Sequence, residues 1–486
     1  MLNAFSLATA LFARSSVRAM ASLSTAAAPT GRVAVVGGGV TGLAAAKSLI
    51  NQQVPCTLID MGGRGVGGRV SSRVLELEGG QGPLSFDAGA QFFTAATPEF
   101  QRELAGWAAA GAAREWSGRH GRIAAGGDFE LGQPGSSGGF FDAGSGQAMW
   151  VGTPTNGALM QHMAQELLAA AAQKQQQQQQ QGQWQDTSRQ QAAPLFELLS
   201  GVAVQSMERT GGGGCGGSGG RWALRGSRQG RAAAAAPAPP PGDQEDLGCY
   251  DAVILADAMP LLPGSAGHVA GIDAAASSLA QLARSVQAVA PQPCFALMVA
   301  FAQSLPGVPF DSATVEQPTT DCTSSSGSDG GSSSGNGGSG SSAFQWVACN
   351  SSKPGRPGGS SPQCWVALTT PQRAQHLLRA HPLIGPGGRF NPQTGEYRAA
   401  VAAELLADFR AFMQPFVQGA LPEPVHVSAQ RWGRAFVTEP LGAELLFLPA
   451  QRLALCSDVA AGGGVEAAWR SGRAAGETVG RMLRSA

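Results

Sequence analysis

The feature that most constrains the fold is the segment of residues 32–60, which reads RVAVVGGGVTGLAAAKSLINQQVPCTLID. RVAVVGGG predicts a buried strand that ends in glycines, because its apolar run is short and bounded by a turn. TGLAAAKSLINQQ predicts a helix, since it contains good helix formers and places Leu43, Ala46 and Ile50 on one face. PCTLID predicts a second strand that ends at Asp60. A strand, a helix and a strand within about thirty residues indicate a β-α-β unit.

Three glycines in the first turn of this unit match the pattern G-x-G-x-x-G. Gly37 permits the tight turn, Gly39 lets the backbone approach a pyrophosphate, and Gly42 lets the helix pack on the strand. The helix N-terminus faces the phosphates, and Asp60 is placed to accept hydrogen bonds from a ribose. Because no Walker lysine is present, the segment predicts a dinucleotide site and not a P-loop. The residues expected to bind the dinucleotide are Gly37, Gly39, Val40, Thr41, Gly42 and Asp60.

The stretch after Asp60, MGGRGVGGRVSSR, is too basic and too rich in glycine to form a core. Glycine amides and arginine side chains are suitable partners for phosphate or ring oxygens. Because the chain directly after Asp60 must pass along the same dinucleotide, we expect contacts to it from Arg64, Gly67, Gly68 and Arg69.

Net charge and composition exclude several classes of function. The 33 basic and 33 acidic side chains give zero formal net charge, so no overall field favours nucleic acid or an anionic membrane. No apolar run is long enough to span a bilayer, so we expect a soluble protein. The eight cysteines contain no CxxC pair and suit a reducing compartment, and the six histidines lack metal-ligand spacing, so no metal site is predicted.

The N-terminal segment, residues 1–31, is rich in Ala, Ser and Thr and contains Arg14 and Arg18 but no acidic residue. This composition predicts an organelle transit peptide that is removed from the mature protein. SVRAM is similar to the cleavage context of chloroplast transit peptides, so we expect a chloroplast address, with the mitochondrion as the alternative. A secretory signal peptide is disfavoured because the arginines follow the apolar run and do not precede it. A disordered N-terminal tail with no targeting function remains an alternative.

Four tracts contain too few large apolar side chains to pack into a core, and we expect them to be loops or disordered insertions. The entropic cost of closing a surface loop rises only slowly with its length, so the fold tolerates these tracts. They are residues 173–185, rich in Gln; 211–220, rich in Gly; 231–248, rich in Ala and Pro; and 324–342, rich in Ser and Gly.

Four blocks, in order along the chain, resemble the flavin amine-oxidase superfamily and most closely its renalase-like branch. The blocks are VVGGGVTGLAAAKSL, DMGGRGVGGRVSSR, FDAGAQFFTA and LCSDVAAGGGVEAAWRSGRAAGETV. NSSKPGR and QRWGRA are similar to further segments of that branch. The resemblance implies FAD as the cofactor. We expect non-covalent FAD, because no covalent attachment motif is recognisable.

The resemblance also implies roles for individual residues. It places the glycine turn, Asp60 and the segment 64–69 along the pyrophosphate, the ribose and the ribityl chain. Asp458 would bind near the ribityl chain and the pyrophosphate. Val465 would begin a helix whose positive dipole end stabilises the reduced flavin. Close to the isoalloxazine would lie Gly89, Ala90, Gln91 and Phe92.

These observations predict an α/β protein with a Rossmann-like FAD-binding domain and a second, substrate domain that contains a mixed β-sheet. SGVAVQSM and RWALR predict strands of a small sheet, and YDAVILADAMP predicts a strand that returns to the Rossmann sheet. CFALMVAFAQ, AFQWVACN and CWVALTT predict three apolar strands of the substrate domain. We expect residues 32–99, 186–265 and 440–486 in the FAD-binding domain, and residues 100–185 and 266–439 in the substrate domain.

The resemblance implies that a hydride passes from a small organic donor, such as a reduced nicotinamide species, to flavin N5, and that oxygen then accepts the electrons as H2O2. Because no second dinucleotide motif occurs in a strand-helix context, the donor must enter the substrate pocket itself. Gln91 and Trp432 are the candidate pocket residues, whereas Lys353, beside Pro354, is expected in a surface turn. Hydride transfer to flavin requires no protein nucleophile, and the sequence does not predict a catalytic residue.

Three alternatives remain open. An amine oxidase of the same superfamily is disfavoured, because its aromatic cage is typically rich in tyrosine and this chain contains only Tyr250 and Tyr397. Desaturation of a polyene or another lipid has no specific sign in the sequence. A protein that binds FAD without turnover, as a scaffold, is the third alternative.

Overall fold

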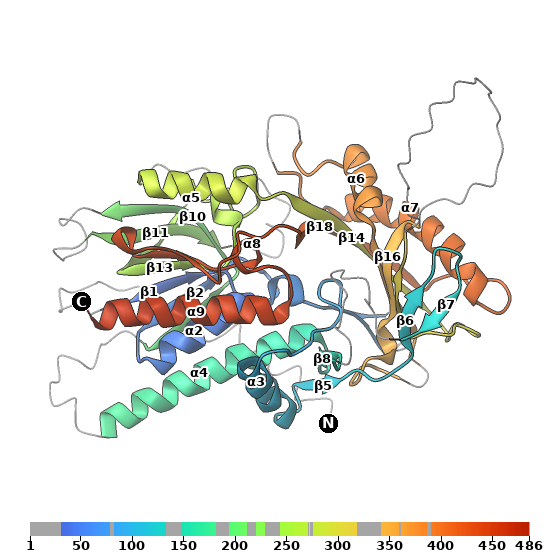
Figure 1. Ribbon diagram of the computed structural model, residues 1–486, viewed down its shortest axis with the longest axis horizontal. Helices are drawn as coiled ribbons and strands as arrows, with labels where there is room; N and C mark the ends of the chain where they lie inside the picture. Colours follow the sequence, from blue (N-terminus) through green and yellow to red (C-terminus); the bar gives the residue numbers. More distant parts are fainter. Residues whose placement is uncertain are drawn as a thin grey trace.

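The computed structural model describes residues 31–77, 82–132, 147–180, 194–210, 220–228, 244–270, 272, 276–317, 342–358, 361–385 and 390–485. The transit-like segment up to residue 30 and most of the low-complexity tracts lie outside these ranges. Figure 1 shows two units side by side along the long axis of the molecule, each built around its own sheets.

The first unit contains a six-stranded sheet in the order β19-β20-β13-β1-β2-β9. The strands β20, β13, β1, β2 and β9 are parallel to one another, and β19 is antiparallel to β20. The β-α-β prediction and the predicted return strand are therefore confirmed. The bounds are β1 (Val33–Val36), β2 (Cys56–Asp60), β9 (Phe196–Ser200), β13 (Ala252–Leu255), β19 (Leu446–Leu448) and β20 (Leu453–Leu455).

Helices cover one face of this sheet. The helices α2 (Val40–Asn51) and α9 (Val465–Arg484) lie side by side on this face and pack closely on each other. Glycines on α9 permit this close packing: a Cβ at Gly472 would lie 1.9 Å from the Thr41 carbonyl oxygen, and one at Gly476 would lie 2.4 Å from that of Ala45. The helices α3 (Pro98–Ala109) and α4 (Asn156–Gln180) contribute to the same core, although residues 100–185 were expected in the substrate domain.

A three-stranded antiparallel sheet and one helix cover the other face. The sheet contains β10 (Val202–Thr210), β11 (Arg221–Arg228) and β12 (Glu245–Tyr250), and the helix is α5 (Ser277–Ala288). The two strands predicted for a small sheet are confirmed as β10 and β11.

Two of the expected loop tracts are partly regular. Residues 173–180 continue α4, so the prediction of a loop was wrong there, because glutamine is a good helix former even where it cannot pack into a core. Residues 245–248 belong to β12, so that part of the tract 231–248 was also misassigned. Ladder pairing with β11 stabilises this strand despite its polar sequence.

The second unit is a seven-stranded mixed sheet in the order β18-β14-β17-β16-β15-β6-β7. The pair β15 and β6 is parallel and the other pairs are antiparallel. The three predicted apolar strands are confirmed as β14, β17 and β16. The bounds are β6 (His120–Ile123), β7 (Phe129–Leu131), β14 (Pro291–Phe301), β15 (Ser312–Val315), β16 (Phe344–Cys349), β17 (Gln363–Thr369) and β18 (His426–Val437).

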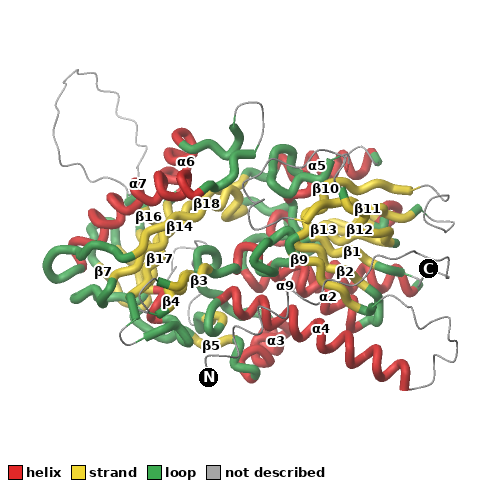
Figure 2. Tube along the Cα trace, turned by 180° about the vertical axis from the view of Figure 1, so that it is seen from behind, coloured by secondary structure: helices red, strands yellow, loops and turns green. Residues whose placement is uncertain are grey.

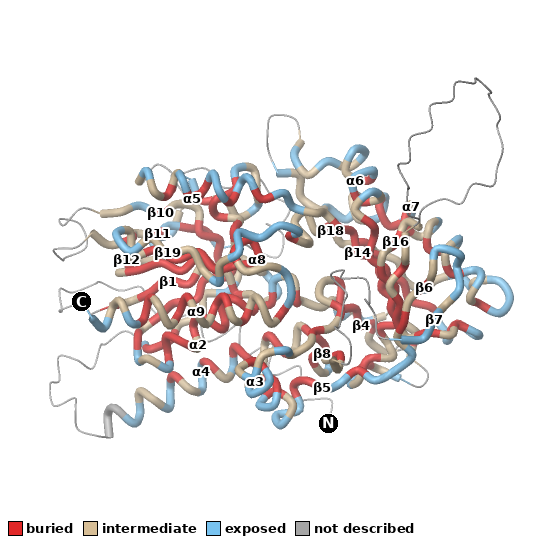
Figure 3. The backbone as a smooth tube through the Cα atoms, in the orientation of Figure 1, coloured by how far each residue is buried: buried red, intermediate tan, exposed pale blue. Residues whose placement is uncertain are grey.

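The seven-stranded sheet is covered on both faces, and its strands are the most deeply buried part of this unit (Figure 3). The helices α6 (Pro371–Ala380) and α7 (Gly395–Met413) pack on one face. The hairpin of β3 (Arg73–Glu76) and β4 (Pro83–Phe86) packs on the other face, between the two units, as Figure 2 shows. The remaining described strands are the antiparallel pair β5 (Ala113–Glu115) and β8 (Trp150–Gly152), and the remaining described α-helix is the short α8 (Asp458–Ala461).

Most of the described cysteines are free thiols inside these cores. Cys56, Cys294, Cys349, Cys364 and Cys456 are free and buried, while Cys249 is in a disulfide bond. Burial raises the pKa of the Cys56 and Cys294 thiols to about 12, so these groups are protonated and unreactive near neutral pH.

Candidate functional site

A cavity of about 1610 Å³ lies at the carboxyl ends of β1, β2 and β13 and extends to β18 of the second unit. This edge of a parallel sheet is where ligands of open α/β folds bind. The cavity is larger than the 300–1,000 Å³ typical of a site for one small molecule. The predicted residues that line it are Gly37, Gly39, Val40, Thr41, Asp60, Arg64, Gly67, Gly68, Arg69, Gly89, Ala90, Gln91, Phe92, Trp432, Asp458 and Val465.

The glycine turn after β1 shows three different uses of glycine. Gly37 has φ +112°, a backbone conformation that would be strained in a residue with a side chain. A Cβ at Gly42 would lie 1.8 Å from the Gly37 carbonyl oxygen, so Gly42 packs α2 onto the turn and does not line the cavity. A Cβ at Gly39 would meet no protein atom within 4 Å. The turn therefore leaves open space at Gly39, where a phosphate could approach the backbone.

Asp60 lies at the end of β2 with its carboxylate between two backbone amides. Its Oδ1 accepts a hydrogen bond from the amide of Gly38 at 2.9 Å, and its Oδ2 accepts one from the amide of Gly62 at 3.1 Å. Burial raises the pKa of Asp60, and these two hydrogen bonds oppose that rise. A carboxylate has about four acceptor positions, so Asp60 is oriented and can still accept hydrogen bonds from a ribose.

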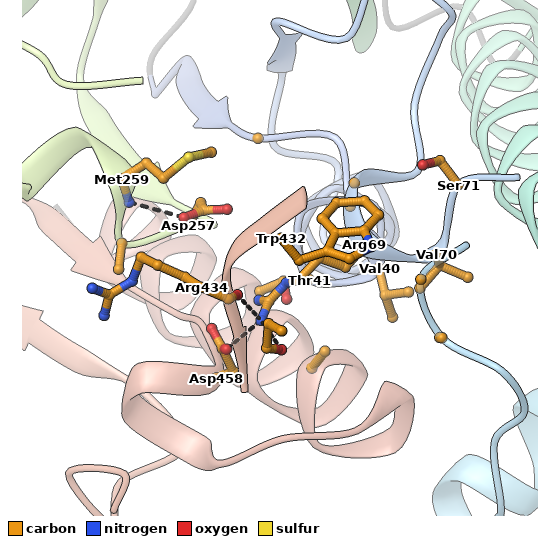
Figure 4. A pocket seen from close by; sticks show the side chains of 18 of the residues that line it. Val40, Thr41, Arg69, Val70, Ser71, Asp257, Met259, Trp432, Arg434 and Asp458 are labelled. Atoms are coloured by element: carbon orange, nitrogen blue, oxygen red, sulfur yellow. Dashed lines mark hydrogen bonds and ion pairs between the residues drawn. The ribbon is translucent and has the colours of Figure 1, made fainter. Parts of the chain in front are cut away.

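Arg69 joins three segments that are far apart in the sequence. Its guanidinium donates to the carboxylate of Asp458 and to the carbonyl of Ala435 at 3.4 Å, and Figure 4 shows it pointing toward Asp458. Burial alone would raise the pKa of Asp458, but attraction to Arg69 lowers it below the usual range. From the sequence, Arg69 and Asp458 were expected to contact the same cofactor, but the ion pair between them was not predicted.

Two further charged residues at this end of the cavity were missed from the sequence. Asp257 follows β13 and accepts a hydrogen bond from the amide of Met259 at 2.8 Å. Arg434, two residues after Trp432 on β18, lines the same cavity, and its positive charge favours the ionised form of Asp257. Burial raises the pKa of Asp257, while Arg69 opposes the rise. Asp257 could have been predicted, because it is an acidic residue just after β13, the strand that was expected to return to the Rossmann sheet.

The N-terminus of α9 opens onto the cavity at Val465, as predicted. Gly464, with φ +104°, precedes the helix and provides no side-chain cap. The carboxylate of Glu466 accepts hydrogen bonds from the amides of Ala96 and Thr97 at 2.7 and 2.8 Å, which fixes the end of the helix. The first amides of α9 therefore direct a partial positive charge into the cavity.

Beneath the cavity lies a buried cluster of charges that was not predicted. Lys353 is only 2% exposed, so its assignment to a surface turn was wrong. Its ammonium lies 3.0 Å from Oδ2 of Asp87, which is fully buried and also pairs with Arg356. Oδ1 of Asp87 accepts hydrogen bonds from Ser72 Oγ at 2.6 Å and from the amide of Asn156 at 3.1 Å. The lysine is buried because Asp87 offers it a partner, which local sequence does not reveal.

This cluster holds the loop that forms the cavity wall. Gln91 Nε2 donates to the carbonyls of Asp87 at 2.5 Å and of Gly89 at 2.9 Å. Asn156 Nδ2, at the start of α4, donates to the carbonyl of Ala90 at 2.7 Å. Gln91 is 2% exposed, and its Oε1 is buried without a hydrogen-bond partner. Gln91 therefore presents an unsatisfied acceptor within the loop that lines the cavity.

Lys353 makes the stability of the fold depend on pH. Burial, opposed by Asp87 and reinforced by Arg356, lowers the pKa of Lys353 to about 8 from its ordinary 10.5. Between these values the unfolded chain binds the proton and the folded chain does not, so the free energy of unfolding rises with pH. We expect a rise on the order of 3 kcal/mol that Lys353→Met abolishes, measured by urea unfolding across this range. Equal pH dependence in both proteins would contradict the assignment.

The far end of the cavity is aromatic. Trp432 on β18 donates a hydrogen bond from Nε1 to the carbonyl of Ala88 at 2.8 Å, so its ring is fixed against the loop that contains Gln91. Other aromatic rings that line the cavity are those of Phe92, Phe93, Phe390 and Phe436. Neither of the two tyrosines lines it: Tyr250 is fully buried beside the first sheet, and Tyr397 bonds to the carbonyl of His381 at 3.2 Å.

The described residues contain neither a metal-ligand group nor a membrane-spanning helix. In the ranges given above, no group of three or more His, Cys, Asp or Glu side chains is arranged to hold a metal ion. Among the helices of the same ranges, none is both long and apolar enough to cross a membrane.

Comparison with known proteins gives a family match for part of the chain. Residues 35–114 match the NAD(P)-binding Rossmann-like domain family. No curated protein matches the chain in sequence. The fold is similar to that of a cyclohexylamine oxidase from Brevibacterium oxydans IH-35A, with a TM-score of 0.52 and 12% identity over 94% of this chain and 100% of that one. It is also similar to a protein from Exiguobacterium sp. 255-15 described provisionally as a protoporphyrinogen oxidase, with a TM-score of 0.51 and 14% identity over 94% and 100% of the two chains.

Proposed function

We propose that the protein is an FAD-dependent oxidoreductase that takes a hydride from a reduced nicotinamide species and uses oxygen as the final acceptor, forming H2O2. The observation that carries the proposal is the single continuous cavity, which runs from the Rossmann glycine turn to the aromatic wall at Trp432. Its volume, about 1610 Å³, suits a dinucleotide cofactor together with a substrate.

The residues around the cavity fit FAD in three places. The space at Gly39 admits a pyrophosphate against the backbone, and the carboxylate of Asp60 is oriented to accept hydrogen bonds from a ribose. The first amides of α9 at Val465 open onto the same cavity and favour a negatively charged group there. FAD held there, without a covalent bond, would supply the hydride acceptor.

The protein residues contribute binding, orientation and electrostatics. The N-terminus of α9 at Val465 stabilises negative charge at the end of the cavity that it faces. Trp432 and Phe92 provide flat apolar surfaces against which a planar donor ring can pack. The hydrogen bonds of Gln91 and Trp432 to the loop 87–89 hold these surfaces in place before substrate binds.

An amine oxidase is the second candidate, favoured by the fold shared with the cyclohexylamine oxidase. The cavity wall argues against it, because neither tyrosine of the chain lines the cavity and an aromatic cage would have to consist of Phe and Trp. The identity with that protein is only 12%, which transfers the fold but not the substrate.

Anaerobic reduction of the purified flavoprotein tests the proposal. We expect a reduced nicotinamide to bleach the flavin absorption band and air to restore it with formation of H2O2. Cyclohexylamine and putrescine serve as the comparison donors and should leave the band unchanged. Bleaching by amines alone would favour the second candidate, and an FAD-loaded protein that no donor reduces would indicate a binding scaffold.

A further inference from the structure

Three arginines lie together where the two units meet. Arg64 is expected to contact the cofactor, but the function described above leaves the charges of Arg73 and Arg398 unexplained. Arg64 follows β2, Arg73 begins β3, and Arg398 lies in α7; we call them the arginine cluster. Arg64 and Arg73 line the cavity. Burial, together with the positive charges of Arg64 and Arg398, lowers the pKa of Arg73 to about 10. The three guanidinium groups are therefore close enough to repel one another.

No carboxylate compensates this charge within the described ranges of the chain. Arg69 and Arg356 pair with Asp458 and Asp87, whereas no described acidic group forms an ion pair with any member of the arginine cluster. The hydrogen-bond partner of Arg73 is neutral: its guanidinium donates to Oε1 of Gln430 at 2.5 Å. A guanidinium has five N–H donors, so Arg73 retains several for a ligand.

Neighbouring glutamines fix Arg73 at the substrate end of the cavity. Gln430 Nε2 donates to Oε1 of Gln393 at 3.3 Å, and Gln393 is bound to both backbone groups of Arg431 on the edge strand β18. Gln393 and Gln430 also line the cavity. Because side chains alternate along a strand, Gln430 and Trp432 lie on the same face of β18. Through Gln430, Arg73 is therefore held on the face of β18 that carries Trp432.

We propose that the arginine cluster binds an anionic group of the hydride donor, a phosphate or a carboxylate, with Arg73 as its principal contact. This inference rests on the proposed function and specifies its substrate class. A planar guanidinium forms paired, charge-assisted hydrogen bonds with either anion. A bound anion also relieves the repulsion between the three arginines, whereas a cationic amine would increase it.

Two donors with the same ring and different charge test the inference. We expect reduced nicotinamide mononucleotide to reduce the flavin at about ten- to a hundredfold lower concentration than reduced nicotinamide riboside, which lacks the phosphate. Arg73→Gln should remove this difference, and Arg73→Lys should restore part of it. Arg102→Gln is the matched control, because it removes one positive charge from an exposed site on α3.

Each other outcome has a distinct meaning. If both donors reduce the wild-type flavin at the same concentration, the inference is overturned and the proposed function stands. If Arg73→Gln loses FAD, Arg73 serves the cofactor and the inference is again overturned. If neither donor reduces the flavin, the proposed function fails, and titration of the FAD-loaded protein with inorganic phosphate and with succinate decides the inference. Binding of either anion that Arg73→Gln abolishes supports the site and identifies its chemistry, whereas absence of binding overturns it.

Discussion

The substitution Asp87→Asn is expected to lower the free energy of unfolding by about 3–5 kcal/mol, because it leaves two buried cations without a counter-charge. Asn is nearly the same size as Asp, so the loss reflects charge and not a cavity. Lys353 and Arg356 are 2% and 9% exposed and both pair with Asp87 in the folded protein. Urea unfolding near neutral pH, with both proteins free of cofactor, measures the difference.

Lys353→Met is the matched variant and should cost much less, less than about 2 kcal/mol, because one cation and one anion remain paired. Methionine also fills the space of the lysine stem beside the ring of Trp116, which lies 5.1 Å from the Lys353 ammonium. A loss for Lys353→Met as large as that for Asp87→Asn would contradict this account. It would mean that Lys353 acts through packing and not as one of two competing partners of Asp87.

The sequence predicted those parts of the fold and site in which neighbouring residues carry the signal. The strand, turn and helix around Gly37–Gly42 were predictable because their periodicity and glycine spacing are local. The helix that begins at Val465 was predicted from the resemblance, and Gly472 and Gly476 on α9 explain why it can pack so closely on α2. Sixteen predicted residues line one cavity. Those that follow β1 and β2 meet there because the carboxyl ends of parallel strands lie at one edge, whereas Gly89–Phe92, Asp458 and Val465 were placed by the resemblance.

The features that the sequence did not reveal depend on partners distant in the chain. Lys353 and Asp87 are separated by 266 positions, and only the packing of the second unit against the β3–β4 hairpin brings them together. The repulsion within the arginine cluster likewise arises from three segments that local reasoning treats separately. The helical residues 173–180 were missed for a different reason: a glutamine run has helix propensity without an apolar face.

The pair Gly39→Ala and Gly42→Ala separates cofactor binding from folding. Gly39→Ala is expected to lower FAD affinity about ten- to a hundredfold, since its methyl group would occupy the space reserved for the pyrophosphate. The same change should alter apoprotein stability by less than about 1 kcal/mol, because no protein atom lies within 4 Å of the new Cβ. Gly42→Ala should instead destabilise the apoprotein by about 1–3 kcal/mol, because its Cβ would lie 1.8 Å from the carbonyl oxygen of Gly37.

Titration of each apoprotein with FAD and urea unfolding of the same samples measure the two effects independently. If Gly39→Ala binds FAD as tightly as the wild type, the pyrophosphate does not approach this turn, and the cavity would have to hold the cofactor in another orientation. If Gly42→Ala leaves the apoprotein as stable as the wild type, α2 can move away from the turn at little cost. In that case the close contact between Gly42 and Gly37 would not be what holds the turn open for its ligand.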